Sequence, residues 1–256
     1  MISNIIEIIL LSLVQGVSEF LPISSSAHLN IVEIIFKFKS NSLMIDVSLH
    51  LGSLIAIIYY FRKELLDLQN NQKLLLLIGI GSLPVIIAGY ILHTTRLIYL
   101  LEDNLEIIAW TTLIFGIILY FADKSKLDKK ISSNLNLKTI LYIGFFQILA
   151  LIPGVSRAGI TITAARLFKF DRIDASKISF LLAIPAIAGA SALSLKDVFE
   201  KSYEFSYLIF VAIFFSFLFS YFTVKFFLNY INKSSLNIFV IYRIIIAIVL
   251  FLLIYN

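Results

Sequence analysis

Two polar interruptions in an otherwise apolar chain hold the residue types that could do chemistry. The first, Gln15 to His28, contains the carboxylate of Glu19 and three consecutive serines. The second, Pro153 to Thr161, contains the guanidinium of Arg157. A carboxylate, an imidazole, hydroxyls and a guanidinium are the groups that proton transfer and the binding of phosphate oxygens require.

An anion-binding site is predicted where the two interruptions end. Pro22 and Pro153 each end a helical segment, and the serines that follow are good N-caps for the next helix. Helix N-termini bind anions through free N–H groups and the positive end of the dipole, and the fork of Arg157 suits phosphate. The hydroxyls expected to contribute are those of Ser24, Ser25, Ser26, Ser156 and Thr161.

Acid–base groups lie on the same predicted helices. Gln15 and Glu19 are four residues apart, and Ser25 and His28 are three apart, so each pair can share a helix face. His28 can move protons near neutral pH, whereas Glu19 can act as a base or ligate Mg²⁺ or Ca²⁺. Ser25 beside His28 is therefore a candidate nucleophile with its base.

Packing is the alternative role for several of these residues. Serine and glycine often allow membrane helices to approach closely, and Pro or Gly breaks can be simple kinks. Asp46 and His50, four residues apart, belong either to the wall of the site or to helix packing. Glu33 and Arg166 are expected to pair internally or to reach toward the membrane interface. We predict function where a charge adjoins a break, as for Glu19, His28 and Arg157.

The composition places these motifs in an integral membrane protein built of helices. Of 256 residues, 60% are hydrophobic and 14% are charged, with a mean hydropathy of +0.97. So few charges cannot cover a soluble domain, and intrinsic disorder is excluded for the same reason. The absence of cysteine excludes disulfide and thiolate chemistry, and the net charge of +5 without a basic stripe gives no nucleic-acid partner. Residues 2–14 lack a basic n-region and are expected to stay in the mature protein.

Six membrane spans and two broken segments are predicted from the apolar runs. The spans are expected near residues 43–61, 74–92, 105–121, 178–195, 206–228 and 238–255. The broken segments, 2–37 and 139–168, consist of halves too short to cross a bilayer. Such breaks are tolerated only where protein or a wet cavity satisfies the backbone, so each segment is interpreted as a re-entrant helical hairpin.

The lysines orient this single membrane domain of residues 1–256. The basic loop 122–138 is expected in the cytoplasm, which places both termini outside and opens the first hairpin to the external side. Residues 1–121 and 139–256 are interpreted as two inverted-topology repeats, each one hairpin plus three spans, in which Pro22–Ala27 pairs with Pro153–Ala158. Interrupted segments at matching positions of such repeats predict a site near the midplane.

The two motifs resemble those of a known enzyme family. QGVSEFLPISSSAH (15–28) looks like the first signature of the undecaprenyl-diphosphatases of the bacitracin-resistance type, and PGVSRAGIT (153–161) resembles the second. LGSLIA (51–56) resembles the segment after the family's first hairpin, so the similarity covers nearly the whole chain. The resemblance implies hydrolysis of undecaprenyl diphosphate to undecaprenyl phosphate and inorganic phosphate, which recycles the lipid carrier for peptidoglycan.

The resemblance also implies cofactors, partners and residue roles. It implies a divalent cation, Mg²⁺ or Ca²⁺, held partly by Glu19, and a polyprenyl diphosphate substrate on the outer face of the bacterial plasma membrane. Membrane lipid and, as one option, a second copy in a homodimer are the other partners. By motif position the catalytic residues are Glu19, Ser25, His28 and Arg157. The substrate-binding residues are Gln15, Ser24, Ser26, Gly154, Ser156, Gly159 and Thr161.

This chain departs from the family pattern at four positions. Gln15 leaves the first motif with one carboxylate, Ala158 removes a hydroxyl beside Arg157, Ala27 replaces a usual glycine, and His50 stands where glutamine is common. In the mechanism we favour, Ser25 attacks the terminal phosphorus with His28 as its base. Direct attack by water, with Glu19 or His28 as base, remains the alternative mechanism.

A secondary transporter or lipid flippase is the rival function. Inverted repeats with facing broken helices are a transporter architecture. Transport of an anion would use Arg157 and the helix ends but would not need a nucleophile and a base.

Overall fold

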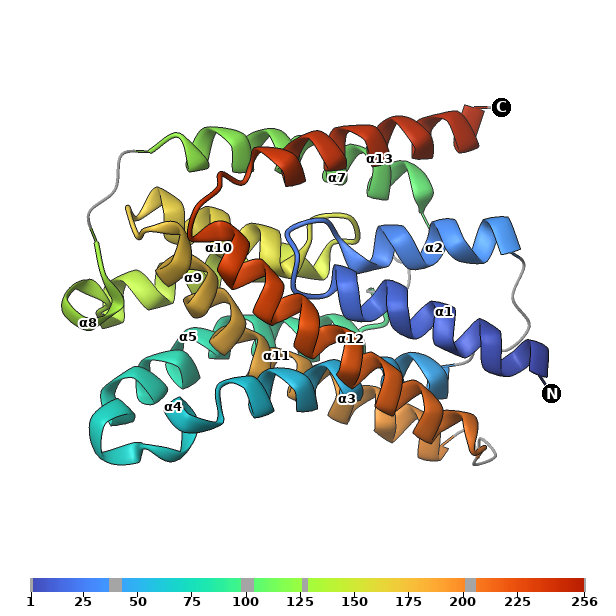
Figure 1. The fold of residues 1–256 in the computed structure, drawn as a ribbon, viewed down its shortest axis with the longest axis horizontal. Coiled ribbons are helices and arrows are strands. Elements are labelled where there is room, and N and C mark those ends of the chain that lie inside the picture. Colours follow the sequence, from blue (N-terminus) through green and yellow to red (C-terminus); the bar gives the residue numbers. More distant parts are fainter. Residues whose placement is uncertain (1, 37–42, 98–103, 126–128, 201–205, 256) are drawn as a thin grey trace.

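The computed structural model describes residues 2–36, 43–97, 104–125, 129–200 and 206–255, and within them the fold is all-α (Figure 1). The first half contains α1 (Ile2–Ser18), α2 (Ser25–Phe36), α3 (Leu43–Tyr60), α4 (Arg62–Leu66), α5 (Leu68–Thr94) and α7 (Leu105–Asp123). The second half contains α8 (Ile131–Asn134), α9 (Leu137–Ile148), the 3₁₀ helix η1 (Leu149–Leu151), α10 (Arg157–Leu167), α11 (Arg172–Glu200), α12 (Leu208–Ile231) and α13 (Asn237–Tyr255).

The prediction of a multi-pass helical membrane protein is confirmed. In the described residues six helices, α3, α5, α7, α11, α12 and α13, are long and apolar enough to cross a bilayer. The structure extends α5 and α11 beyond the predicted spans 74–92 and 178–195. Both helices extend at both ends, and the added first turns are polar, such as the start of α5, where the Asp67 side chain accepts the Asn70 N–H. Hydropathy marks the apolar part of a helix, whereas capping marks its end.

The two broken segments are helix–break–helix units, as predicted. The first consists of α1 and α2 with a break at residues 19–24, and the second consists of α9 and α10 with a break at residues 149–156. Helices α2, α9 and α10 have 11 or 12 residues and therefore reach about 17–18 Å, well short of the ~30 Å of a bilayer core.

Small residues bring the long helices together, as expected for packing between membrane helices. A Cβ on Gly52 of α3 would lie 2.5 Å from the Ile213 carbonyl of α12. Beside it, the Ser53 hydroxyl lies 3.1 Å from the Ser216 hydroxyl and 2.9 Å from the Ser220 hydroxyl. Glycine removes the side chain that would separate the two backbones, and the serines satisfy one another away from water.

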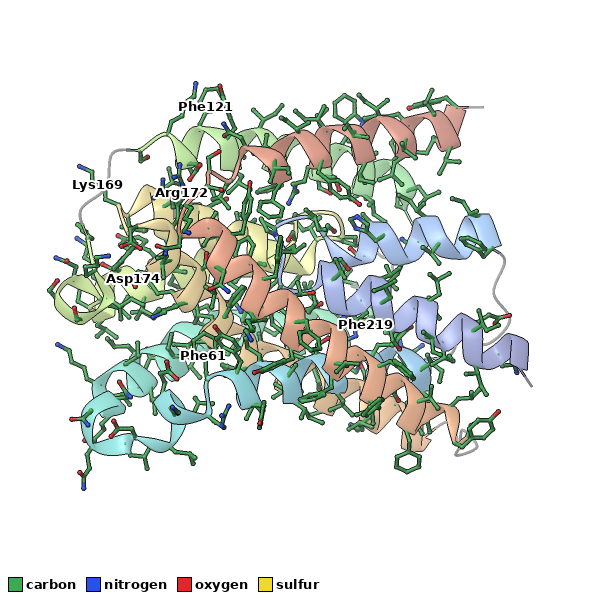
Figure 2. All side chains as sticks on the ribbon, in the orientation of Figure 1. Phe61, Phe121, Lys169, Arg172, Asp174 and Phe219 are labelled. Carbon is green, nitrogen blue, oxygen red and sulfur yellow. The ribbon has the colours of Figure 1, made fainter. Side chains whose placement is uncertain are left out.

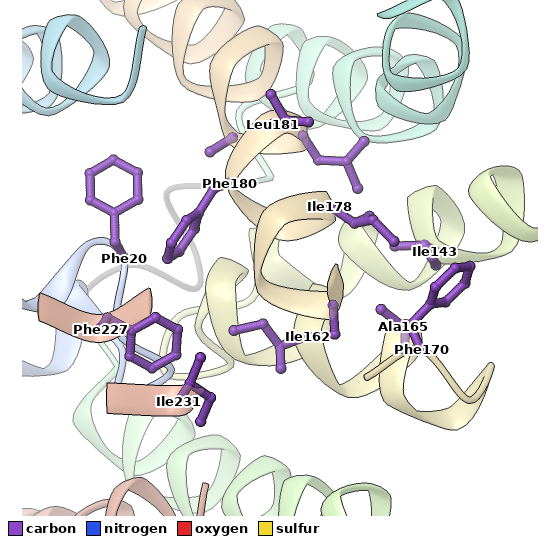
Figure 3. Packing of buried hydrophobic residues seen from close by; sticks show 14 of the residues in the cluster. Phe20, Ile143, Ile162, Ala165, Phe170, Ile178, Phe180, Leu181, Phe227 and Ile231 are labelled. Carbon is purple, nitrogen blue, oxygen red and sulfur yellow. The ribbon is translucent and has the colours of Figure 1, made fainter. Parts of the chain in front are cut away.

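Three buried aromatic rings pack against one another beside the first break. Phe20 follows Glu19 directly and meets Phe180 of α11 edge to face, with ring centroids 5.5 Å apart. Phe227 of α12 packs against Phe180 at 5.8 Å (Figure 3). Because these rings are fully buried, the backbone of residues 19–20 is fixed against two long helices.

Charged side chains gather at one end of the molecule. Figure 2 shows Lys169, Arg172 and Asp174 at the end where α7 and α10 finish, away from the start of α1. Figure 1 places the start of α1 and the end of α13 both at the opposite end, apart from one another. The outer faces of the long helices carry exposed apolar side chains, including Phe121, Phe210 and Phe226, which suits contact with lipid.

Candidate active site

Both breaks contain a serine with left-handed backbone immediately before a helix. Ser24 has φ 75° and precedes α2, and Ser156 has φ 70° and precedes α10. This conformation is uncommon for a residue with a side chain, and here the Ser156 Oγ also accepts the Gly159 N–H at 3.0 Å. The prediction that serine caps α10 is therefore confirmed. Ser24 and Ser156 share this backbone conformation, whereas the predicted repeat aligns Ser25 with Ser156.

A buried carboxylate joins the two breaks. The Glu19 side chain is 7% exposed, and its Oε1 accepts a hydrogen bond from Arg157 Nη2 at 2.9 Å. Its Oε2 accepts from Gln15 Nε2 at 3.0 Å and from Ser25 Oγ at 3.2 Å. His50 Nε2 of α3 lies 3.9 Å from the same oxygen. The structure thus brings Gln15, Glu19, Ser25 and Arg157 into one cluster, and His50 stands at its wall.

His28 and Ser25 were predicted to form a hydrogen bond, but in the structure each bonds to another group. Its Nδ1 lies 2.6 Å from the Ser24 carbonyl, which only accepts, so Nδ1 carries the proton. Nε2 then accepts from the Tyr242 hydroxyl at 2.7 Å. Ser25 and His28 share a helix face because they are three residues apart, but the His28 ring bonds to the Ser24 carbonyl one turn back. Among the described contacts, Ser25 donates to Glu19 instead, so the carboxylate is the base nearest to its hydroxyl.

The remaining predicted hydroxyls and glycines divide into two groups. Ser26 Oγ accepts the Gly154 N–H at 3.4 Å and lies 3.1 Å from Ser24 Oγ, which links the breaks. Thr161, by contrast, is fully buried and bonds to the Arg157 carbonyl at 2.8 Å. Its hydroxyl also lies 2.7 Å from Ser179 Oγ. The prediction that Thr161 offers a hydroxyl to phosphate is not supported, because Thr161 holds α10 against α11.

The glycines of the second break allow close approach. Gly154 has φ 85°, and a Cβ there would lie 2.5 Å from the Ile108 carbonyl of α7. A Cβ on Gly159 would lie 2.9 Å from Arg243 Nη1. Their role is to let the break pack on α7 and α13, and this packing holds the N-terminus of α10 in the site.

Sequence reasoning missed Arg243, the residue that ties both breaks together. This fully buried side chain of α13 donates from Nη1 to the Val155 carbonyl at 3.0 Å and to the Pro22 carbonyl at 3.4 Å. Nη2 donates to the Gly154 carbonyl at 3.0 Å, and Nε donates to the Thr112 carbonyl of α7 at 3.0 Å. A lone charge within the apolar span 238–255 was a signal that could have identified it.

The charges of the site favour an anion. Arg157 and Arg243 bring two guanidinium groups, and Glu19 is the one carboxylate that pairs with either of them among the described residues. The N-termini of α2 and α10 add the positive ends of two helix dipoles. A phosphate or diphosphate would supply the missing negative charge, in a place where buried cations are otherwise costly.

The donor set for a metal ion is small. The described residues contain no group of three or more His, Asp or Glu side chains suited to one ion. However, the Gln15 Oε1 atom is buried and accepts no hydrogen bond from any residue that the structure describes, and it stands one helical turn from Glu19. An amide oxygen and a carboxylate are ligands that Mg²⁺ and Ca²⁺ accept, with phosphate oxygens of a substrate completing the shell.

Known proteins of one family resemble the whole chain. The family described as "Bacitracin resistance protein BacA" matches residues 8–249. An undecaprenyl-diphosphatase from Pelagibacter ubique (strain HTCC1062) is 78% identical over 256 residues, which is all of both chains. Undecaprenyl-diphosphatases from Elusimicrobium minutum (strain Pei191) and Thermodesulfovibrio yellowstonii (strain ATCC 51303 / DSM 11347 / YP87) are 40% and 38% identical, over 96% and 98% of this chain and 96% and 97% of theirs. This chain therefore belongs to the bacitracin resistance protein BacA family.

Proposed function

We propose that this protein hydrolyses undecaprenyl diphosphate to undecaprenyl phosphate and inorganic phosphate. The reaction regenerates the lipid carrier for peptidoglycan and gives resistance to bacitracin. The observation that carries the proposal is the hydrogen-bonded chain from Ser25 through Glu19 to Arg157, which joins a nucleophile, a base and a phosphate-binding cation across the two breaks. The family and the relatives named above support the same activity.

In the mechanism, the diphosphate binds between Arg157 and the N-termini of α2 and α10. Positioning and charge stabilisation of this kind do most of the work in phosphoryl transfer. Glu19 Oε2 takes the proton of Ser25, whose Oγ attacks the terminal phosphorus while undecaprenyl phosphate leaves. Glu19 gives this proton to the leaving undecaprenyl phosphate and is a carboxylate again. Water then attacks the phosphoserine while Glu19 accepts the water proton and returns it to Ser25 Oγ, so that inorganic phosphate is released and the serine is restored. His28 holds the Ser24 carbonyl and so keeps the break in shape for this attack.

Glu19 replaces His28 as the base that we assign to Ser25, because the carboxylate accepts the serine hydrogen bond. Direct attack by water with Glu19 as base is the competing mechanism. Brief reaction, acid quenching and mass spectrometry of the peptide that contains Ser25 distinguish the two. A phosphoserine at residue 25 supports the covalent route, whereas turnover by Ser25→Ala near the wild-type rate contradicts it.

A divalent cation, Mg²⁺ or Ca²⁺, fits this site with Glu19 and the Gln15 amide oxygen as its protein ligands. The unpartnered Gln15 Oε1 supports this assignment. When bound, the ion would neutralise charge on the phosphate oxygens. With only two protein ligands, binding of the ion should be weak without substrate. Calcium binding that is equally tight with and without a diphosphate lipid would contradict this assignment.

The protein is proposed to sit in the bacterial plasma membrane with its site open to the external side. The basic residues at the end of α7 and the start of α11 support a cytoplasmic position for that end. An inverted repeat is proposed as well, because α1 packs on α12 much as α9 packs on α5. The matching left-handed serines at 24 and 156 support the same relation.

The activity test is phosphate release from undecaprenyl diphosphate by the purified protein in detergent, with Mg²⁺, with Ca²⁺ and with a chelator. Arg157→Ala should lower the rate by about 10³-fold, the loss expected for a guanidinium that stabilises phosphoryl transfer. Arg62→Ala is the matched control, since Arg62 packs on Tyr59 at the surface. Release at the wild-type rate from Arg157→Ala would contradict the assigned site. Protein that binds the lipid diphosphate but releases no phosphate with any metal would favour the transporter.

A further inference from the structure

A second cavity lies at the charged end of the molecule, where α7, α10 and α12 finish and α11 and α13 begin. Its volume is about 660 Å³, within the range of ligand sites, and it is lined by polar side chains with Tyr120, Ile173 and Ile231. The cavity is separate from the site of Arg157. Helix α10 has 11 residues and starts at Arg157, so its far end, with Arg166, lies about 14 Å along the axis.

Cations outnumber carboxylates in this cavity. Lys124, Lys130, Arg166 and Arg172 line it, together with the two carboxylates of Asp123 and Asp171. Lys130 pairs with Asp171, so Asp123 must serve two guanidinium groups. Because the lining carries two more positive than negative charges, one dianion would balance it.

The sharing of Asp123 is visible in its hydrogen bonds. Arg172 donates to both of its oxygens at 2.9 Å, from Nε and Nη2. Arg166 Nη2 lies 3.0 Å from Oδ1, and the Leu236 N–H donates to Oδ2 at 3.0 Å. Both oxygens of Asp123 thus already have partners. Its single negative charge leaves one of the two guanidinium charges uncompensated. The predicted internal pairing of Arg166 is confirmed, with Asp123 as partner, whereas the Glu33 side chain lies outside the described residues.

Two donors of the cavity are left for a ligand. Arg166 is 1% exposed, and its Nε has no hydrogen-bond partner among the described residues, an arrangement that is costly for a buried N–H. The Lys124 ammonium rests 4.2 Å over the Tyr120 ring and makes no ion pair in the described part of the chain. A guanidinium and an ammonium that face one cavity are the groups that bind phosphate oxygens.

We propose that this cavity is a second anion site that binds a phosphate dianion, with Lys124 and Arg166 as its ligands and Arg172 adding positive charge beside them. The phosphate comes either from a lipid head group or from free inorganic phosphate. Basic cavities between helix ends on the cytoplasmic side of membrane proteins commonly hold lipid phosphates. The site is independent of the catalytic function proposed above, because it shares no residue with the cluster around Glu19.

The test measures binding of inorganic phosphate and of short-chain phosphatidic acid to the full-length protein by titration calorimetry. Arg157→Ala serves as the background, because it removes phosphate binding at the catalytic cluster. Adding Lys124→Gln should weaken binding about tenfold, which corresponds to about 1.4 kcal/mol. Adding Lys138→Gln, a change to an exposed lysine that does not line this cavity, should change binding less than twofold.

The two ligands identify the source of the phosphate. Phosphatidic acid bound at least tenfold more tightly than inorganic phosphate supports a lipid head group, and equal affinities support the free ion. Should Arg157→Ala fail to fold, a two-site titration of the wild-type background replaces it, and Lys124→Gln should weaken one of the two phosphate sites about tenfold and leave the other unchanged. Equal weakening by Lys124→Gln and Lys138→Gln, or no binding to folded Arg157→Ala, would overturn the proposal.

Discussion

Replacing Arg243 with lysine tests whether the geometry of this side chain, rather than its charge, holds the site together. Arginine offers five N–H donors in one plane, and here they reach carbonyls of both breaks and of α7. Lysine keeps the charge but has three donors around one nitrogen. At best it retains the bonds to the carbonyls of Gly154, Val155 and Thr112, which are 3.0 Å long. It loses the two bonds at 3.4 Å, to the carbonyls of Pro22 and Thr111.

The expected cost follows from those two lost bonds. A hydrogen bond to a charged group contributes about 1.5–3 kcal/mol, with bonds at 3.4 Å at or below the lower end, so the free energy of unfolding should fall by about 2–3 kcal/mol. The bond to the Pro22 carbonyl is the contact from Arg243 to the first break, and its loss lets Ser25 shift relative to Arg157. A misplacement of about 1 Å costs about 10²-fold in rate, so kcat should fall roughly 30- to 100-fold.

The assay combines steady-state phosphate release with the thermal unfolding midpoint in the same detergent. Arg243→Gln is the companion variant and should lose more stability, because it also removes the charge. Arg62→Lys, at an exposed arginine outside the site, is the matched control for the substitution itself. Wild-type kcat together with an unchanged unfolding midpoint in Arg243→Lys would refute the reasoning, because the charge alone would then suffice.

Three further predictions concern the base, a helix contact and a surface ion pair. Glu19→Gln should lower kcat at least about 10³-fold and abolish phosphoserine formation at Ser25, measured by acid quench, because the base is gone. Gly52→Ala should lower the free energy of unfolding by about 1–3 kcal/mol, since the new Cβ would lie 2.5 Å from a backbone carbonyl of α12; chemical denaturation measures this. Burial raises the pKa of Asp171, but the Asp174 N–H and Lys130 outweigh it and hold that pKa below its usual 3.8. The ionised Asp171 carboxylate therefore stabilises the folded protein above pH 3.8, and this stabilisation is lost as the pH falls through the folded-state pKa. The difference in unfolding midpoint between wild type and Asp171→Asn should consequently shrink from pH 6 to pH 3.

Each of these predictions has a matched control. For Glu19→Gln the control is Glu64→Gln, a carboxylate outside the site. For Gly52→Ala it is Gly79→Ala, because a Cβ on Gly79 would meet nothing within 4 Å and should leave the protein as stable or slightly more so. For Asp171→Asn it is Asp67→Asn, at the start of α5. A stable Gly52→Ala, an active Glu19→Gln, or a pH-independent difference for Asp171→Asn would each contradict the corresponding argument.

The spans and the meeting of the two breaks could be predicted because they depend on local signals. A run of about 20 apolar residues identifies a helix that crosses a bilayer, and proline beside serine identifies where a helix stops and restarts. The joint site followed from chemistry, since Glu19 and Arg157 are costly in a membrane unless they pair. The resemblance of the two motifs to a known family strengthened the same conclusion.

The contacts that the sequence could not predict depend on three-dimensional packing. Thr161 follows Arg157 by one helical turn, but only the approach of α11 decides that its hydroxyl meets Ser179. His28 shares a face with Ser25, yet the Ser24 carbonyl and Tyr242 of α13 occupy both ring nitrogens. Neither the left-handed backbone at Ser24 nor the contacts of α13 with the breaks is encoded in a spacing that a single sequence shows.

The position of Arg243 near the end of the chain sets an order of events during synthesis. Glu19 and Arg157 are 138 residues apart, and Arg243 follows Val155 by another 88. A nascent chain that already contains both breaks still lacks the guanidinium that joins them, since α13 leaves the ribosome after the other helices that the structure describes. The active site is therefore completed by the insertion of α13, and a chain that stops before Asn237 would carry every predicted catalytic group without the arginine that holds them together.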